Sequence, residues 1–353
     1  MASSTLFLVI FSAILFGLCG TTFSNQQEVK KTIQTKHGVY DCVDFYKQPA
    51  FSHPLLKNHA YKLQNLEELQ EQKSDGIELK DGGCPLKTVP ILRSNPNSNV
   101  FKIQRGIPDT HCVALVHTNN PEERKFLGVA GELENYKPIV YPNQWSSTRI
   151  KILNQNDNIE VGWMVNPDVF QDNEAHLYAS FVALARQEGC INLLCPGFVQ
   201  VAKDVPLGIS PANYSEYGGT QYGWHLSIDK HEDDKHYWVS IITDIKKVIG
   251  YYPKELFSFP DYFSQVEWGG EISNPKQSFP PPEMGNGKKA LYNPFYTASI
   301  MHASYVDWNY TNVLNPEDTH KVWDCEASYT VKDAGWKTEE FGRLMLYGGF
   351  NER

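Results

Sequence analysis

The segment QVEWGGEIS, residues 265–273, alternates apolar and polar side chains as a β-strand does. Successive side chains of a strand point to opposite faces, so Val266, Trp268 and Ile272 share one face. Glu271 lies on the opposite face, directly after two glycines. The pattern predicts an antiparallel strand with one packed face and one open face.

Similar short alternating runs recur from His111 onward, separated by Gly, Pro, Asn and Asp. Many short strands with frequent turns are typical of a β-sandwich or barrel. Before them, residues 60–73 space three leucines at helical intervals and predict a helix between Pro-punctuated segments. The change in composition places a domain boundary between about Ser94 and Ile107.

A second strand, NIEVGWMV at residues 158–165, repeats the arrangement of a glutamate close to a glycine. Its alternation leaves Glu160 and Gly162 on the open face, as Glu271 and Gly269 are in the first strand. A glycine beside a carboxylate gives a substrate backbone room to approach. The positions on the packed face are Ile159, Val161, Trp163 and Val165.

Two carboxylates that meet on one sheet can perform acid and base chemistry. Burial and mutual repulsion push their proton affinities apart, so one can activate water while the other donates a proton. Glu160 and Glu271 are the candidate residues. The alternative is that both are ordinary glutamates on solvent-facing strands, since periodicity does not say whether the two strands are adjacent.

The bulk composition indicates a globular protein. A chain of 353 residues with 41% hydrophobic residues can bury a sizeable core. A net charge of -9, with no stripe of basic residues, argues against nucleic acid as a partner.

The amino terminus indicates the secretory pathway. The apolar run from Leu6 to Leu18 ends among small residues, as a secretory signal peptide does. No later segment has the roughly 18 unbroken apolar residues of a membrane span. We therefore expect a secreted or vacuolar protein that does not bind membranes, with glycosylation acceptors at Asn213 and Asn309.

The cysteines fit an oxidising compartment, with six remaining beyond the one in the signal region. Cys190 and Cys195 are close enough to clip one tight loop, and their spacing differs from that of a redox C-x-x-C pair. Cys42 and Cys84 both lie early in the chain. Cys112 and Cys325 either pair with each other or stay free.

Several long segments resemble the neprosin family of plant proteins. DCVDFYKQPAFSHPLLKNH and GCPLKTVPILR look like its activation-peptide region. NIEVGWMVNPDVFQDN, GCINLLCPGFVQ, VIGYYPKELF and VEWGGEI look like its peptidase domain. The resemblance covers most of the chain from about Tyr40 to Ile272.

The resemblance implies a secreted glutamic peptidase with an antiparallel double-sheet β-sandwich of the jelly-roll or concanavalin type. Its family cleaves polypeptides after proline without a metal or cofactor. The family's two catalytic glutamates lie in I-E-x-G-W and W-G-G-E motifs, which match Glu160 and Glu271 here. A pair that shares a proton implies activity at acidic pH.

The resemblance also implies the domain order. Residues 1–23 are expected to be a signal peptide, 24–100 a small α+β activation peptide and 101–353 the peptidase sandwich. The activation peptide would be held by a Cys42–Cys84 disulfide, inhibit the cleft and be removed in acid. Cleavage after Pro96 is a hypothesis that follows from the preference for proline. The alternative is an independent small module that stabilises the protein.

The chain departs from the family pattern beyond Ile272. PPPEMGNGKKALYN replaces a longer Gly-Ser-Gly stretch, and the chain ends YGGFNER where many members continue to a last cysteine. YGWHLSIDK is also less acidic than its family counterpart. The resemblance therefore implies that Cys325 lacks its usual partner and that the rim of the cleft is altered.

Other motifs predict no cofactor. The row His231–His236 is rich in metal-ligand types but lies between two alternating strands, which favours a solvated hairpin turn. The glycine-rich segments lack the phosphate-binding pattern, and no serine-nucleophile elbow is present. Two other functions stay open: a glycoside hydrolase using the same carboxylates, and a non-catalytic sandwich that binds cell-wall carbohydrate.

Overall fold

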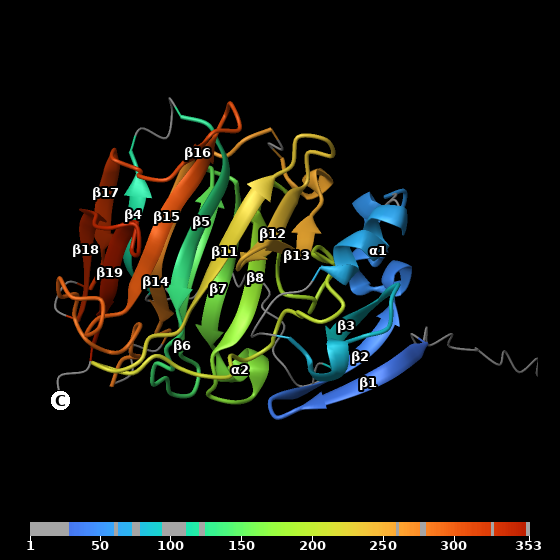
Figure 1. The fold of residues 1–353 in the computed structure, drawn as a ribbon, viewed down its shortest axis with the longest axis horizontal. Helices are drawn as coiled ribbons and strands as arrows, with labels where there is room; N and C mark the ends of the chain where they lie inside the picture. The colour runs from blue at the N-terminus through green and yellow to red at the C-terminus, as the bar shows by residue number, and fades with distance from the viewer. Residues whose placement is uncertain are drawn as a thin grey trace, which may run out of the picture.

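The computed structural model describes residues 28–59, 63–72, 78–93, 111–119, 124–258, 261–275, 280–325 and 328–350. The predicted signal peptide and the hypothetical cleavage point after Pro96 lie outside these residues. In the described part the chain is mainly antiparallel β-structure, with two large stacked sheets and one small sheet (Figure 1). Among the residues described here, no helix has the length and apolar character needed to cross a membrane.

The first large sheet contains both glutamate strands. Its seven described strands have the order β17-β4-β14-β6-β7-β8-β9, and every neighbouring pair is antiparallel. In chain order they are β4 His111–Thr118, β6 Trp145–Leu153, β7 Asp157–Val165, β8 His176–Ala183, β9 Glu188–Ile191, β14 Gln265–Ser273 and β17 Thr319–Trp323.

The second large sheet covers the apolar face of the first. Its strand order is β10-β13-β12-β11-β5-β15-β19-β18, and β16 pairs with β15. The strands are β5 Phe126–Glu134, β10 Val199–Gln200, β11 Gly223–Lys230, β12 Tyr237–Ile242, β13 Lys246–Tyr252, β15 Ser299–Asp307, β16 Asn312–Val313, β18 Tyr329–Trp336 and β19 Arg343–Gly349.

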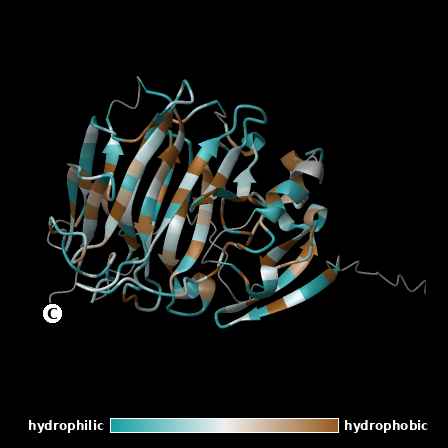
Figure 2. Ribbon diagram, viewed as in Figure 1, coloured by the Kyte–Doolittle hydropathy of each residue, from teal (hydrophilic) through white to brown (hydrophobic). Residues whose placement is uncertain are grey.

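The main core lies between these sheets and follows the predicted alternation. Val266, Trp268 and Ile272 are fully buried there, together with the four predicted core residues of β7. The strands in Figure 2 accordingly alternate between hydrophobic and hydrophilic residues. The faces predicted for the two glutamate strands, and the double-sheet fold, are thus confirmed.

The amino-terminal region forms a separate small sheet with helical turns around it. Its elements are β1 Val29–Thr35, β2 Gly38–Asp44, α1 Leu63–Glu71 and β3 Thr88–Leu92. Helix α1 lies inside the predicted range 60–73. Elsewhere, a short helix α2, Pro167–Phe170, follows β7 and is capped by Asn166.

This region packs against one flank of the sandwich, beside β10 and β13 (Figure 1). Phe45 and Leu66 share an apolar cluster with Trp238 and Tyr251 of the large sheet. Buried glutamines add hydrogen bonds: the side chain of Gln48 both donates to and accepts from the backbone of Gln200. The two parts are therefore joined by apolar contacts and by satisfied polar groups.

Three disulfides link the described cysteines: Cys42–Cys84, Cys112–Cys325 and Cys190–Cys195. The first and last match the expected pairs. Of the two alternatives left open for Cys112 and Cys325, the structure has the pair: Cys325, expected to lack its usual family partner, bonds to Cys112 at the start of β4. The two cysteines are 213 residues apart, and only the pairing of β17 with β4 brings them together. The predicted glycosylation acceptors Asn213 and Asn309 are both exposed.

Candidate active site

The two glutamate strands do not pair with each other. Strand β6 lies between β7 and β14 and pairs with both. Arg149 of β6 is in register with Gly162 on one side and Gly269 on the other. Glu160 and Glu271 thus lie on one face with Arg149 between them, about 10 Å apart across the strands. They are also offset by four residues along β6, since Glu160 is in register with Lys151 and Glu271 with Ser147.

The Arg149 side chain joins three glutamates. Its Nε atom lies 2.8 Å from Oε2 of Glu271 and 3.4 Å from Oε2 of Glu160. Its Nη1 atom lies 2.8 Å from Oε2 of Glu267. Because Oε2 of Glu160 and Oε2 of Glu271 both contact this Nε atom, they can be no farther apart than the sum of the two distances. One guanidinium therefore gathers the two candidate carboxylates at a single point.

This contact fixes the charge of Glu271. Burial of that carboxyl acts to raise its pKa, but the Arg149 charge and a hydrogen bond with His111 outweigh burial and hold the pKa of Glu271 well below its usual range. Burial likewise acts to lower the pKa of Arg149, while Glu271, Glu267 and Glu160 raise it well above its usual value. Arg149 and Glu271 are therefore both ionised at acidic pH.

Different groups surround Glu160. Ser180 Oγ donates to its Oε1 at 2.9 Å, and the Tyr178 hydroxyl approaches the same oxygen at 3.4 Å. Lys151 Nζ lies 3.5 Å from Oε2. Burial, followed by the charge of Glu160, raises the pKa of Tyr178 well above its usual value, so this hydroxyl keeps its proton.

Glu271 has its own second partner at the edge of the site. His111 Nδ1 lies 3.0 Å from Oε1 of Glu271, and the His111 ring contacts Trp145 edge-on at 5.4 Å between centroids. Oε1 of Glu271 is thus oriented by His111 of β4, while Oε2 is held by Arg149 of β6.

The cluster of Glu160, Glu267, Glu271, Arg149 and Lys151 has an uneven charge. Three carboxylates face two permanent cations, so a single additional proton, held by a carboxyl or by His111 beside Glu271, would balance the charge of the described groups. The carboxylate side chains are 12 to 16% exposed, whereas that of Arg149 is 3% exposed. The acids can therefore reach a substrate or water while the guanidinium lies beneath them.

Gly162 and Gly269 were expected to give a substrate room to approach, and the structure shows a second reason for them. A Cβ on Gly162 would strike the backbone oxygen of Thr148, and one on Gly269 would strike that of Ala114. Gly269 also has φ of +155°, which side chains rarely adopt. The glycines let neighbouring strands approach closely on the glutamate face.

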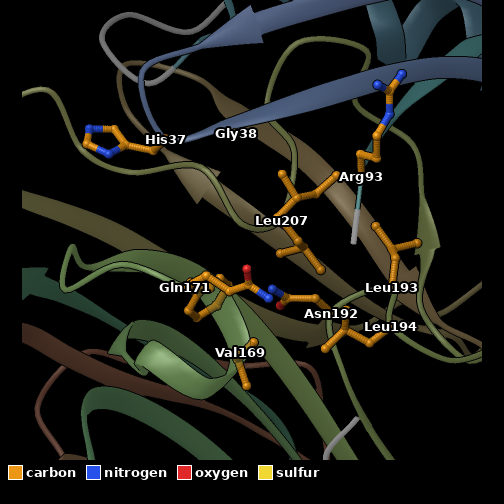
Figure 3. A pocket seen from close by; sticks show the side chains of 11 residues that line it. His37, Gly38, Arg93, Val169, Gln171, Asn192, Leu193, Leu194 and Leu207 are labelled. Atoms are coloured by element: carbon orange, nitrogen blue, oxygen red, sulfur yellow. The ribbon is translucent and has the colours of Figure 1, made fainter. Parts of the chain in front are cut away.

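An apolar cluster adjoins the acids on the same face. Met164, Tyr178 and Ile191 are buried there, with Phe170 and Leu194 partly buried against them. Phe170 and Leu194 also line a pocket whose opposite wall is formed by His37 and Arg93 of the amino-terminal region. Figure 3 shows this pocket between the β1–β2 hairpin and α2.

The structure brings Glu160 and Glu271 together, but sequence reasoning missed Arg149, Ser180 and His111. The segment WSSTRIKIL of β6 does alternate, with Arg149 on the same face as Lys151, so it could have been read as a strand of the same kind. Which strands β6 pairs with could not be read from it. The row His231–His236 forms the turn between β11 and β12, as predicted.

Two family models match the chain. The neprosin model matches residues 142–350, which include the glutamate cluster, and the neprosin activation peptide model matches residues 32–105. The structural similarities are more distant. They include scytalido-glutamic peptidase with a peptide-based transition state analog (6% identity, TM-score 0.36) and with a transition state analog inhibitor (7%, 0.38), and the eqolisin-family peptidase SCP-B with the tripeptide Ala-Ile-His (8%, 0.36). Each covers 69% of this chain and 100% of the other.

Proposed function

The chain belongs to the neprosin family, and from this premise we propose that it is a secreted endopeptidase of the glutamic type that cleaves after proline in acid. The observation that carries the proposal is the shared contact of Glu160 and Glu271 with Nε of Arg149. That contact puts two acids with different surroundings on one face, within reach of the same substrate bond.

The surroundings assign a role to each acid. Glu271 is held ionised by Arg149 and His111, so it is the base that takes a proton from the attacking water. Glu160 faces the hydroxyls of Ser180 and Tyr178, which tolerate either protonation state. Its contacts with Arg149 and Lys151, at 3.4 and 3.5 Å, are longer than the 2.8 Å contact of Glu271 with Arg149, so we assign Glu160 as the acid.

The reaction is then hydrolysis without a covalent intermediate. The water oxygen bonds to the peptide carbonyl carbon while its proton passes to Glu271. Protonated Glu160 stabilises the charge that develops on the carbonyl oxygen. The C–N bond breaks as Glu160 passes its proton to the nitrogen, which gives a free acid and a free amine. The proton held by Glu271 then returns to Glu160 through water, which restores both acids for the next cycle.

This division of roles requires an acidic medium. Glu271 must be ionised while Glu160 is protonated, and a carboxyl gains a proton only in acid. Because the pKa of Glu271 lies below the usual range, it stays ionised where ordinary glutamates are protonated. Activity should therefore be confined to acid and decline toward neutral pH.

Apolar side chains next to the acids can account for the proposed preference for proline. Beside Glu160, the partly buried side chains packed over Met164, Tyr178 and Ile191 can accept a side chain without charge; these are Trp145, Phe170 and Leu194. A proline before the cleaved bond would place its ring there.

The amino-terminal region would act as the inhibitor of the same protein. Its β1–β2 hairpin reaches the pocket beside Phe170 and Leu194, where His37 lies 3.6 Å from Asp172. Bound there, it restricts one approach to the glutamate face until acid releases it.

The test is cleavage of a proline-containing peptide by acid-treated protein, with products identified by mass spectrometry. Glu160→Gln and Glu271→Gln should each lower kcat at least about 10³-fold. Glu267→Gln, in the same cluster but without a chemical step, should lose much less. Full activity in either of the first two variants would contradict the proposal. A parallel incubation with cell-wall polysaccharide distinguishes the alternatives: sugar release indicates a glycosidase, and retention without products indicates a binding module.

A further inference from the structure

We propose that His59, His236 and Glu255 form a site for a divalent ion of the zinc class, which joins the activation-peptide region to the sandwich. His59 follows the helical turn Pro54–Leu56 of the activation-peptide region. His236 precedes β12, and Glu255 lies in the turn Lys254–Leu256 after β13. Three segments that are distant in sequence thus present one ligand each.

The spacing of the three groups suits one ion. One potential ligand atom from each residue lies within 4.8 Å of the other two. Nδ1 of His236 is 3.9 Å from Oε2 of Glu255, and the two histidine rings are 5.0 Å apart between centroids. Ligands around tetrahedral zinc are about 3.4 Å apart, given bonds of about 2.1 Å. Small rotations of the half-exposed Glu255 side chain and of the two imidazole rings would close the difference.

An unsatisfied atom points to a missing ligand. Oε2 of Glu255 is buried and has no hydrogen-bond partner among the described residues. Buried carboxylate oxygens are nearly always hydrogen-bonded or bound to a cation. This oxygen faces His236 instead, at a distance too long for a hydrogen bond.

The surrounding residues support the histidines as ligands. His59 Nε2 lies 2.5 Å from the Tyr251 hydroxyl, the kind of outer partner that fixes a metal-binding imidazole. The His236 ring stacks on the same tyrosine at 5.1 Å. A metal at Nδ1 of His236 would replace the 3.2 Å hydrogen bond from the Lys254 backbone.

The local charge also favours a cation. Glu255 brings one negative charge to the two imidazoles. Asp234, anchored by Trp238, adds a second negative charge nearby.

Two nitrogens and one oxygen are the donors that zinc prefers. Magnesium and calcium favour sites built of oxygen alone. Three protein ligands at a partly exposed site leave the fourth position to water. Because His59 comes from the activation-peptide region, the complete site exists only while that region is docked, and bound metal would stabilise the docked state.

The test uses the full chain, freed of metal by a chelator and kept at pH 7.5. Titration with Zn²⁺ by calorimetry, and with Co²⁺ by visible absorption, should show one site per chain. Glu255→Gln, which keeps the shape of the side chain, and His59→Gln should each weaken binding at least tenfold. Glu232→Gln, an acidic residue of the β11–β12 turn outside the cluster, is the matched control and should bind normally.

Thermal unfolding gives the second readout. Zn²⁺ should raise the Tm of the parent and of Glu232→Gln, but not that of Glu255→Gln. Absence of binding, or binding and Tm shifts that survive in Glu255→Gln and His59→Gln, would overturn the proposal. None of these measurements depends on peptidase activity, so they are independent of the proposed reaction.

Discussion

Two buried cations hold carboxylates in different parts of the molecule and in different surroundings. Arg149 joins three glutamates on one face of one sheet. Lys247, 1% exposed, joins Glu78 of the activation-peptide region at 2.9 Å to Asp204 of the sandwich at 2.7 Å. The first set of acids comes from neighbouring strands, whereas the second comes from segments that the fold must bring together.

The difference lies in how the charges balance and how open they are. The Arg149 cluster has more acids than cations, and its acids share one side open to solvent. At Lys247 the acid on the sandwich is nearly closed off, since the Asp204 side chain is 7% exposed. Burial raises the pKa of Asp204 in spite of the lysine. We interpret Arg149 as a device that sets protonation for chemistry, and Lys247 as one that docks two regions.

The largest expected effect is on docking. Lys247→Met leaves Glu78 and Asp204 close together without their cation, which should cost about 3 to 5 kcal/mol of stability. Urea unfolding at neutral pH measures it. Lys246→Met is the matched control, because Lys246 is 41% exposed and its pair with Asp229 should contribute under about 1 kcal/mol. Adding Glu78→Gln and Asp204→Asn to Lys247→Met should recover most of the loss. Equal effects of the two lysine variants would show that burial does not distinguish them.

A third buried acid, Glu134, shows how burial changes the pKa of a carboxyl that has no ion pair among the described residues. Glu134, at the end of β5, accepts a hydrogen bond from the Ser299 backbone at 2.8 Å, and the described residues offer it no ion pair. Burial raises its pKa to about 8. Because the pKa of Glu134 is higher in the folded than in the unfolded protein, Glu134 contributes its full stabilisation below pH 4.5. This contribution is lost as the pH rises through 8.

In the parent, the free energy of unfolding should therefore fall by an amount on the order of a few kcal/mol between pH 4.5 and 8. In Glu134→Gln this fall should be absent. Urea midpoints across this range measure it, as the difference between parent and variant. The variant should be the more stable protein at pH 8, with the advantage fading toward pH 4.5. A difference that does not change with pH would mean that Glu134 is not protonated on folding.

Arg149→Lys tests the assigned purpose of the first cation. Lysine keeps the charge but not the fork that contacts several acids at once, so the pKa of Glu271 should rise toward its usual value. Since the proposed reaction needs ionised Glu271, the acid limb of kcat/KM should move to higher pH, with a loss of about 10- to 100-fold at low pH. If kcat/KM falls equally at every pH, Arg149 acts on geometry and not on protonation.

Local patterns in the sequence predict the faces of the strands but not their neighbours. Alternation assigned Trp268 to the core and Glu271 to the open face, because side-chain period depends on the strand alone. The position of β6 between β7 and β14 is a property of the whole sheet. The central role of Arg149 therefore had no local signal beyond its place in an alternating segment.

Contacts between residues that are distant in the sequence could not be predicted for the same reason. Cys112 and Cys325 lie at opposite ends of the sandwich sequence, and the family pattern pointed away from their bond. His236 was predicted to be part of a solvated turn. It does lie in the turn, but its side chain is buried against Tyr251 and next to His59 of the other region. Family resemblance selected Glu271 over Glu267, which periodicity could not separate.

The smallest expected effect separates the hydroxyls at Glu160. Ser180 donates at 2.9 Å and Tyr178 approaches at 3.4 Å, so Ser180 should hold the acid in position more firmly. Ser180→Ala should lower kcat/KM about fivefold, the equivalent of one hydrogen bond of about 1 kcal/mol, and Tyr178→Phe should lower it less. Because neither change alters the contacts of Arg149 with Glu271, the acid limb of the pH profile should stay in place in both. A shift of that limb in Ser180→Ala would mean that the two acids titrate as one unit, and the separate roles given to Glu160 and Glu271 would have to be abandoned.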